Sequence, residues 1–546
     1  MQLKKVRPII ESSFVQLCII FLAAILLKEL GIVSIEDNVL IIFAYILALS
    51  SIPPILKIKE IKVGKIPYVL IILISIFLFT FAVRLLPYAE NSVPLGYDAG
   101  LYKHVIELYA DNLPDVPEAG LPEWVKSAYP QGLFLLTNEL HIFGFDSIEL
   151  IKIFFPFLCA FLIFPLFVVT REFFDERTAI IAAILCALSA TQFHVFSLLY
   201  FKNVLALILM LVSIYFLKKE RYALLILSYT ALGACHKPTF LLFTLILILY
   251  LGQLVFSLIR SRNKEGTNGR SKNVLIKKIK FTILTLVAVG ILLMPFYLTR
   301  IDLYYNVLSS AVDAPSGGTF INFQEYEWLS IAYLPFALIG FLYLAIKRDF
   351  NLLFLWAAVN GSIVVFKLLF YNRFIIPLDL IFIILGAIGL NYVFLDSKKI
   401  SKRLAVALLL LVFISSGVIL AERVQNTRAS ITENQLEAVV WLSKNTEDGA
   451  YMLALSYDAP WVLGWSKRRV IAPGLFEYDR HETDEWREFF RTKDLNETKE
   501  FLSVYERPLY IYHSGKYKYI LDLEKFDSEC FEKVYDRGAV IYRYLC

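Results

Sequence analysis

The segment PLGYDAGLYKH places an acidic side chain at the start of a helical pattern, directly after a long apolar run. Asp98 stands in a glycine-containing turn, and residues 99–112 carry apolar side chains at three- and four-residue spacing. A carboxylate at a membrane surface can act as a general base on an acceptor hydroxyl, because partial desolvation raises its pKa toward a useful value. The alternative is an N-cap for the following helix. The sequence leaves both interpretations open, with Asp98 as the candidate catalytic residue.

Basic residues at the ends of several apolar runs are candidates for binding a substrate. Lys237 lies in CHKPT beside His236, and Arg373 lies in YNRFIIPLDL. A guanidinium at the level of the lipid head groups matches a phosphate or diphosphate through paired hydrogen bonds. For most of these residues, snorkelling to the membrane surface is an alternative role. The predicted substrate-binding residues are Arg373, Lys237, His236, Lys202, Lys103, Tyr102 and His104.

Metal and disulfide chemistry have different support in the sequence. Neither HExxH nor CxxC occurs, so a zinc enzyme is unsupported; no metal or other cofactor is predicted to be required, although a divalent metal is not excluded.

Cys530 and Cys546 flank two short strand patterns around Asp536, Arg537 and Gly538. A hairpin there would bring the two sulfur atoms together, which makes this pair a candidate disulfide.

The elements that position these residues are membrane-spanning helices. The chain has 546 residues, of which 58% are hydrophobic and 19% charged, and its mean hydropathy is +0.63. The apolar residues gather into about thirteen stretches, most of them long enough for a helix to cross roughly 30 Å of hydrocarbon. Continuous runs such as LIILISIFLF exclude the alternating pattern of a membrane β-barrel. The predicted fold class is therefore an α-helical polytopic membrane protein.

Lysine and arginine concentrate in alternate loops, such as MQLKKVR, KIKEIKVGK and KKISKR. The positive-inside rule then makes the N-terminus cytoplasmic and, with an odd number of spans, puts the C-terminal domain outside. These loops account for the net charge of +5, so a nucleic-acid-binding surface is not predicted.

Two domains are predicted. Residues 1–421 form the membrane domain, with long exterior loops at 87–147 and 300–327, and helices are expected at 99–112 and 131–144 in the first loop. Residues 422–546 form a small extracytoplasmic α/β domain. It begins with a helix capped by Thr432 with Gln435 three residues later, and continues with strands YMLALS, RRVIAP and PLYIYHS and a final hairpin.

Taken together, GYDAGLYKH, AYPQG, HKPT, NRFIIPL and AVVWLSKNT make the chain resemble the membrane-embedded C-type (GT-C fold) glycosyltransferases, especially their archaeal and bacterial members. The resemblance covers nearly the whole chain in layout but only short motifs in residues. It implies transfer of a sugar from a polyprenyl-phosphate or diphosphate donor at the outer face, to a glycan, lipid or protein acceptor. It also implies Asp98 as the base, with Arg373 and either Lys237 or His236 at the donor phosphate.

The chain departs from the metal-dependent oligosaccharyltransferases in two motifs. It lacks a DxD-type motif in a later loop and a WWD motif in the terminal domain, and the other candidate carboxylates, Asp302, Asp313, Glu325 and Glu327, follow the ninth span. These departures favour a metal-independent enzyme that uses a monophosphate-linked single sugar. The alternatives are a transporter or flippase of lipid-linked sugars, for which no internal repeat is visible, and a non-catalytic membrane protein that binds glycans.

Overall fold

The computed structural model describes residues 19–34, 39, 68–89, 92–112, 117, 120–121, 125, 131–262, 269–297, 321–395, 401–516 and 521–546. The chain divides into two compact units. Unit 1 comprises residues 1–84, 157–196 and 200–426, and unit 2 comprises residues 85–156, 197–199 and 427–546. The first long loop therefore belongs to the same unit as the C-terminal tail. Residues 300–320 of the second long loop, with Asp302 and Asp313, lie outside the described residues.

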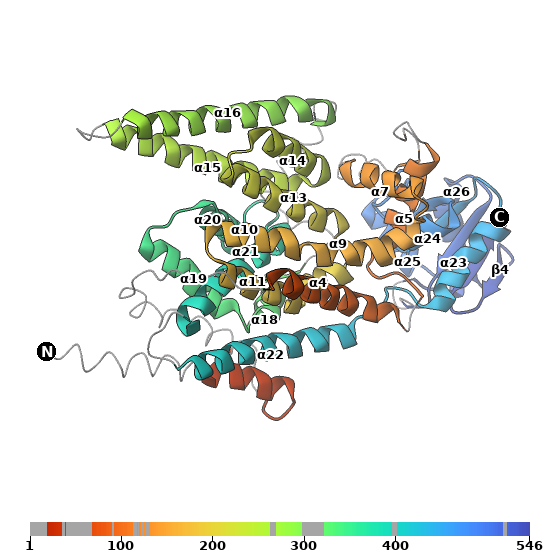
Figure 1. Cartoon of the computed structure of the whole chain (residues 1–546). Helices are drawn as coiled ribbons and strands as arrows, with labels where there is room; N and C mark the ends of the chain where they lie inside the picture. Colours follow the sequence, from red (N-terminus) through yellow and green to blue (C-terminus); the bar gives the residue numbers. More distant parts are fainter. Residues whose placement is uncertain are drawn as a thin grey trace. The chain divides into compact units, whose positions relative to one another are not determined.

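Unit 1 is built from helices. They are α4 (Val69–Leu85), α9 (Phe155–Phe161), α10 (Ile163–Phe173), α11 (Glu176–Leu188), α12 (Ala190–Ser197), α13 (Phe201–Lys218), α14 (Tyr222–Cys235), α15 (Lys237–Arg262), α16 (Gly269–Tyr297), α18 (Phe323–Leu329), α19 (Leu334–Lys347), α20 (Leu352–Val365), η4 (Tyr371–Phe374), α21 (Ile375–Leu390), η5 (Asn391–Leu395) and α22 (Lys402–Asn426). Figure 1 shows the long helices α15 and α16 lying side by side, and the two helices contact each other.

Several of these helices can cross a membrane. Among the described residues, six helices are long and apolar enough, or up to eight if each bent pair forms one span. The bent pairs are α11 with α12, at 47°, and α18 with α19, at 95°, while α14 and α20 are shorter apolar helices. The predicted class of helical membrane protein is confirmed, and the number thirteen stays a prediction.

Glycine residues let two central helices of unit 1 approach closely. A Cβ atom on Gly340 of α19 would lie 2.0 Å from the carbonyl oxygen of Leu385, and one on Gly389 of α21 would lie 2.0 Å from that of Phe336. In a membrane, the hydrophobic effect does not drive helices together. Small residues instead allow the helix backbones to approach closely and to gain van der Waals contacts. Helices α19 and α21 therefore pack backbone to backbone within unit 1.

Unit 2 combines helices with one mixed sheet. Its elements are η1 (Leu86–Tyr88), α5 (Ala99–Asp111), α7 (Gly132–Ile142), α8 (Ser147–Glu149), η2 (Leu150–Phe154), α23 (Glu433–Asn445), β1 (Tyr451–Ala454), α24 (Ala459–Ser466), β2 (Arg469–Ile471), α25 (Thr483–Arg491), α26 (Leu495–Ser503), β3 (Leu509–His513), η6 (Glu524–Phe526), β4 (Phe531–Asp536) and β5 (Val540–Tyr544). The strand order is β2-β1-β3-β5-β4. Strand β1 is parallel to β2 and β3, and β5 is antiparallel to β3 and β4. Figure 1 shows helices α23 to α26 beside this sheet.

Local sequence signals explain how unit 2 is built. The predicted capping box is present, because Thr432 accepts from the backbone of Gln435 and the Gln435 side chain accepts from the backbone of Thr432. Aromatic and aliphatic side chains from the sheet and from α25 and α26 form the core, with Trp486, Phe489 and Ile511 at 2% exposure or less. The predicted small α/β fold and the helices of the first loop are confirmed. A disulfide joins Cys530 to Cys546 across the end of the final hairpin, with the Cα atoms 5.0 Å apart.

Candidate functional site

The predicted site residues fall into two groups. Asp98, Tyr102, Lys103 and His104 belong to unit 2, whereas Lys202, His236, Lys237 and Arg373 belong to unit 1. Each group is described within its own unit.

Asp98 immediately precedes α5 and is half-buried. It occupies the N-cap position with φ −81° and ψ 6°, and its side chain makes no capping hydrogen bond to the helix. Its backbone carbonyl accepts the first helical bond, from Tyr102. The carboxylate therefore does not cap α5, and the role of Asp98 as a general base stays a prediction.

Glycine contacts fix the position of α5 within unit 2. A Cβ atom on Gly100 would lie 2.0 Å from the carbonyl oxygen of Pro460, and one on Gly464 would lie 2.3 Å from that of Gly100. The Lys103 ammonium donates to the carbonyl of Gly464 at 3.0 Å. The first loop and α24 are thus joined backbone to backbone, and this contact orients the turn that holds Asp98.

The other predicted residues of α5 differ in their surroundings. Tyr102 is 1% exposed and packs near Phe134, with ring centroids 6.3 Å apart. Lys103 is 8% exposed, and its ammonium lies 2.8 Å from the Glu107 carboxylate in addition to its bond to Gly464. These contacts hold both side chains within unit 2, and their predicted part in substrate binding stays a prediction. His104 instead lines a cavity of about 440 Å³ in unit 2.

In unit 1 the structure brings four predicted residues together. His236 lies in the turn between α14 and α15, Lys237 begins α15, Lys202 lies in the first turn of α13 and Arg373 lies on η4. His236 is 6% exposed, and its Nδ1 atom lies 2.8 Å from the Thr239 hydroxyl. Burial lowers the pKa of His236 well below its ordinary value, and the positive charges of Lys202, Arg373 and Lys237 lower it further. We call Lys202, Lys237 and Arg373 around neutral His236 the cation cluster.

The cation cluster is suited to a phosphate group. Its three charged side chains are half-buried, so their charges are less screened than those of fully exposed side chains. Arg373 can pair with two phosphate oxygens at once, while each lysine acts as a point charge with three donors.

A second polar cluster in unit 1 was not predicted. The Arg423 guanidinium on α22 lies 3.0 Å from the Glu325 carboxylate on α18, and its Nε atom lies 3.1 Å from Nδ1 of His194 on α12. Glu325, one of the predicted candidates for a second carboxylate, is thus paired with an arginine. The position of Arg423 in the last turn of a span can be seen in the sequence. Its partners could not be predicted, because Glu325 and His194 lie far away along the chain.

A third cluster surrounds the fully buried Asp379 of α21. Its carboxylate accepts from the Gln192 amide at 2.6 Å, from the Tyr333 hydroxyl at 2.5 Å and from the Ser189 hydroxyl at 3.2 Å. Ser189 stands at the bend between α11 and α12, and Tyr333 at the bend between α18 and α19. One buried carboxylate therefore ties both bends to α21, which is the helix that follows η4 and Arg373.

No group of three or more His, Cys, Asp or Glu side chains suited to a metal ion occurs among the described residues.

The fold is that of the membrane-embedded C-type (GT-C) glycosyltransferases, so the predicted fold is confirmed. The apo oligosaccharyltransferase of Archaeoglobus fulgidus matches with a TM-score of 0.60 and 13% identity, over 82% of this chain and 69% of that chain. The same archaeal enzyme, AglB, in complex with an inhibitory peptide and a dolichol-phosphate also gives 0.60, at 14% identity and the same coverage. ArnT from Cupriavidus metallidurans bound to undecaprenyl phosphate gives 0.55 at 10% identity, over 87% of this chain and 98% of that chain.

No family model matches the chain, and no curated protein sequence matches it either. At the identities of the structural neighbours, the likeness shows the fold alone.

Proposed function

We propose that this chain is a glycosyltransferase that moves a sugar from a polyprenyl-phosphate-linked donor to a glycan, lipid or protein acceptor. The cation cluster carries the proposal, because it gathers three positive charges around a buried neutral histidine at helix ends. The fold supports it, since one neighbour was solved with dolichol-phosphate and another with undecaprenyl phosphate.

In the proposed reaction, Asp98 takes a proton from the acceptor hydroxyl. The freed oxygen attacks the anomeric carbon of the donor sugar from the face opposite the phosphate. The bond between that carbon and the phosphate oxygen breaks, and the leaving phosphate keeps the electron pair. Arg373 and Lys237 stabilise the charge that develops there. One displacement of this kind inverts the configuration at the anomeric carbon.

Further parts of the proposal concern topology, donor and metal. The distribution of basic loops supports a cytoplasmic N-terminus, a membrane domain of residues 1–421 and an extracytoplasmic domain of residues 422–546. The missing DxD and WWD motifs support a monophosphate donor carrying one sugar, with no required metal. Addition of a chelator is then expected to leave transfer unchanged.

Replacement of Asp98 by Asn tests the assignment of the base. Membranes with the Asp98→Asn chain are expected to transfer a radiolabelled sugar from polyprenyl phosphate at least about 100-fold more slowly than wild type, because general-base catalysis contributes about that much or more. Asp484→Asn, at an exposed carboxylate of α25, is the matched control and is expected to leave the rate unchanged. An unchanged rate in Asp98→Asn would exclude Asp98 as the base, whatever the fold.

A further inference from the structure

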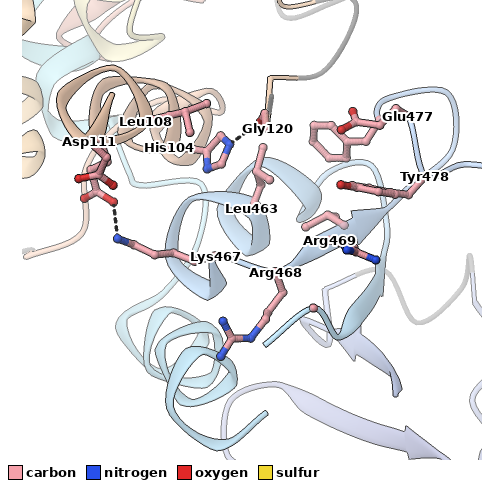
Figure 2. Close-up of a pocket in the computed structure, with 14 residues that line it drawn as sticks. His104, Leu108, Asp111, Gly120, Leu463, Lys467, Arg468, Arg469, Glu477 and Tyr478 are labelled. Carbon is pink, nitrogen blue, oxygen red and sulfur yellow. Dashed lines mark hydrogen bonds and ion pairs between the residues drawn. The ribbon is translucent and has the colours of Figure 1, made fainter. Parts of the chain in front are cut away.

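Unit 2 contains a cavity that the proposed chemistry does not use. Its volume of about 440 Å³ lies within the range of roughly 300 to 1,000 Å³ that is usual for small-molecule sites. Its walls come from α5, from the end of α24, from the start of β2 and from residues 476–478. Figure 2 shows His104, Leu463 and Tyr478 gathered around it, whereas Arg468 points away.

Apolar groups line one part of the cavity. They are Leu108, Leu463, Val470 and Phe476, of which the last three are 7% exposed or less. Tyr478 adds a second aromatic ring, and the Arg469 guanidinium lies 5.9 Å from its centroid. The flat rings of Phe476 and Tyr478 suit the C–H faces of a ring-shaped ligand.

The charged groups of the lining balance one another. Three are acidic and three are basic, namely Glu107, Asp111 and Glu477 against Lys467, Arg468 and Arg469. Lys467 and Glu107 lie 3.3 Å apart, and Arg468 is bound to Asp448 at 2.9 Å. An anionic ligand would meet the exposed carboxylates of Asp111 and Glu477, and a cationic one would meet Arg469.

His104 adds a neutral acceptor to this lining. Burial lowers the pKa of His104 below its ordinary value, so the ring is uncharged at pH 7. Its Nε2 atom lies 2.9 Å from the carbonyl oxygen of Gly120 and must carry the proton, which leaves Nδ1 as an acceptor.

Taken together, the cavity offers acceptor-only carboxylates, donor-only cations and a neutral imidazole around an apolar surface. Hydroxyl groups satisfy all of these, because each hydroxyl both donates and accepts. We propose that this cavity is a binding site for an uncharged saccharide, seated on Phe476 and Tyr478 with its hydroxyls toward Asp111, Glu477 and Arg469. The proposal does not depend on Asp98, since it concerns binding in the absence of a donor.

The test uses the full chain in lipid nanodiscs, which avoids detergents that carry sugar head groups. Saturation-transfer NMR is recorded with methyl α-mannoside, methyl β-glucoside and methyl β-galactoside as probes, and with glucuronic acid and glucosamine as charged comparisons. At least one neutral probe is expected to bind, and each charged sugar is expected to bind more weakly than that probe. The double variant Asp111→Asn, Glu477→Gln is expected to bind the neutral probe at least fivefold more weakly. The reason is that uncharged amides replace both carboxylates and are weaker hydrogen-bond acceptors.

The control variant Glu437→Gln, Glu500→Gln changes the same number of carboxylates in unit 2 away from the cavity lining. It is expected to bind the probe as wild type does. Equal binding by the cavity variant and the wild type would overturn the proposal. So would the absence of binding by every neutral probe, or preferential binding of a charged sugar or of an unglycosylated peptide. Loss of transfer in Asp98→Asn with saccharide binding retained separates this site from the proposed catalytic one.

Discussion

At the scale of single residues, Arg373 is the side chain of the cation cluster with the geometry to pair with two phosphate oxygens. It lies on η4, next to Phe370, whose ring centroid is 5.7 Å from the guanidinium carbon. Because charge-assisted hydrogen bonds contribute about 1.5 to 3 kcal/mol, Arg373→Gln is expected to raise the KM for the polyprenyl-phosphate donor about 10- to 100-fold. Arg373→Lys keeps the charge without the paired geometry, so its KM for the donor is expected to lie between those of the wild type and Arg373→Gln.

Steady-state kinetics in membranes, with donor and acceptor varied separately, measure this effect. Arg348→Gln removes an exposed arginine at the end of α19 and is the control. A KM for the donor that stays the same in Arg373→Gln would remove Arg373 from the proposed phosphate site.

Asp458 of unit 2 provides a prediction about pH. It is 2% exposed, and burial raises the pKa of its carboxyl group from 3.8 to about 6, although a hydrogen bond with Ser514 and the charge of Lys516 act in the opposite direction. A carboxyl group with a raised pKa in the folded state contributes stability that is present below pH 3.8 and is lost as pH rises through about 6.

Asp458→Asn does not titrate and is expected to lack this loss. From pH 4 to pH 7, the free energy of unfolding of the wild type is expected to fall by about 2 to 3 kcal/mol relative to that of this variant. Thermal unfolding followed by tryptophan fluorescence at both pH values measures the change. Asp484→Asn, at a carboxylate with 84% side-chain exposure, is expected to follow the wild type at both pH values. If the difference in unfolding midpoint between Asp458→Asn and the wild type were the same at pH 4 and pH 7, the raised pKa of Asp458 would be contradicted.

At the scale of elements, the contact between α5 and α24 depends on a glycine. In Gly100→Ala the new Cβ atom would lie 2.0 Å from the carbonyl oxygen of Pro460, which is backbone and cannot rotate away. Overpacking of this kind costs about 1 to 3 kcal/mol. We therefore expect a lower unfolding midpoint and, because Asp98 directly precedes α5, a lower transfer rate. Gly361→Ala has open space on helix α20 and is expected to be neutral or slightly stabilising. An unchanged midpoint in Gly100→Ala would show that α5 and α24 can separate at little cost.

The sequence predicted those elements whose signals are local. Apolar runs predicted the membrane helices, and Thr432 with Gln435 predicted the start of α23. The bends at Ser189 and Tyr333 were not predicted, because each depends on Asp379, which lies 190 and 46 residues away along the chain. The family resemblance implied a place at the donor phosphate for Arg373 and either Lys237 or His236. No local signal predicted the pairing of Arg423 with Glu325, which lie on different helices.

At the scale of the whole molecule, the first loop and the C-terminal tail fold as one unit although more than two hundred residues of membrane domain separate them along the chain. Helix α5 packs against α24, and Lys103, at 8% exposure, is bound to the carbonyl of Gly464. A chain that ends after Asn426 lacks α24 and the sheet. Its α5 would expose residues that are buried in the full chain, because a segment of this length retains little helix without tertiary packing.

Limited trypsin digestion in nanodiscs is therefore expected to cleave after Lys103 in the truncated chain at least tenfold faster than in the full chain, where the bond is protected by folding. Cleavage after Lys218 and Lys219, which lie exposed in unit 1, serves as the internal control and is expected at equal rates in both chains. Mass spectrometry of the fragments gives both rates in one sample. Equal protection of Lys103 in the two chains would mean that the first loop folds without the tail. The expected loss of protection would mean that the turn carrying Asp98 takes its position from a domain encoded at the far end of the chain.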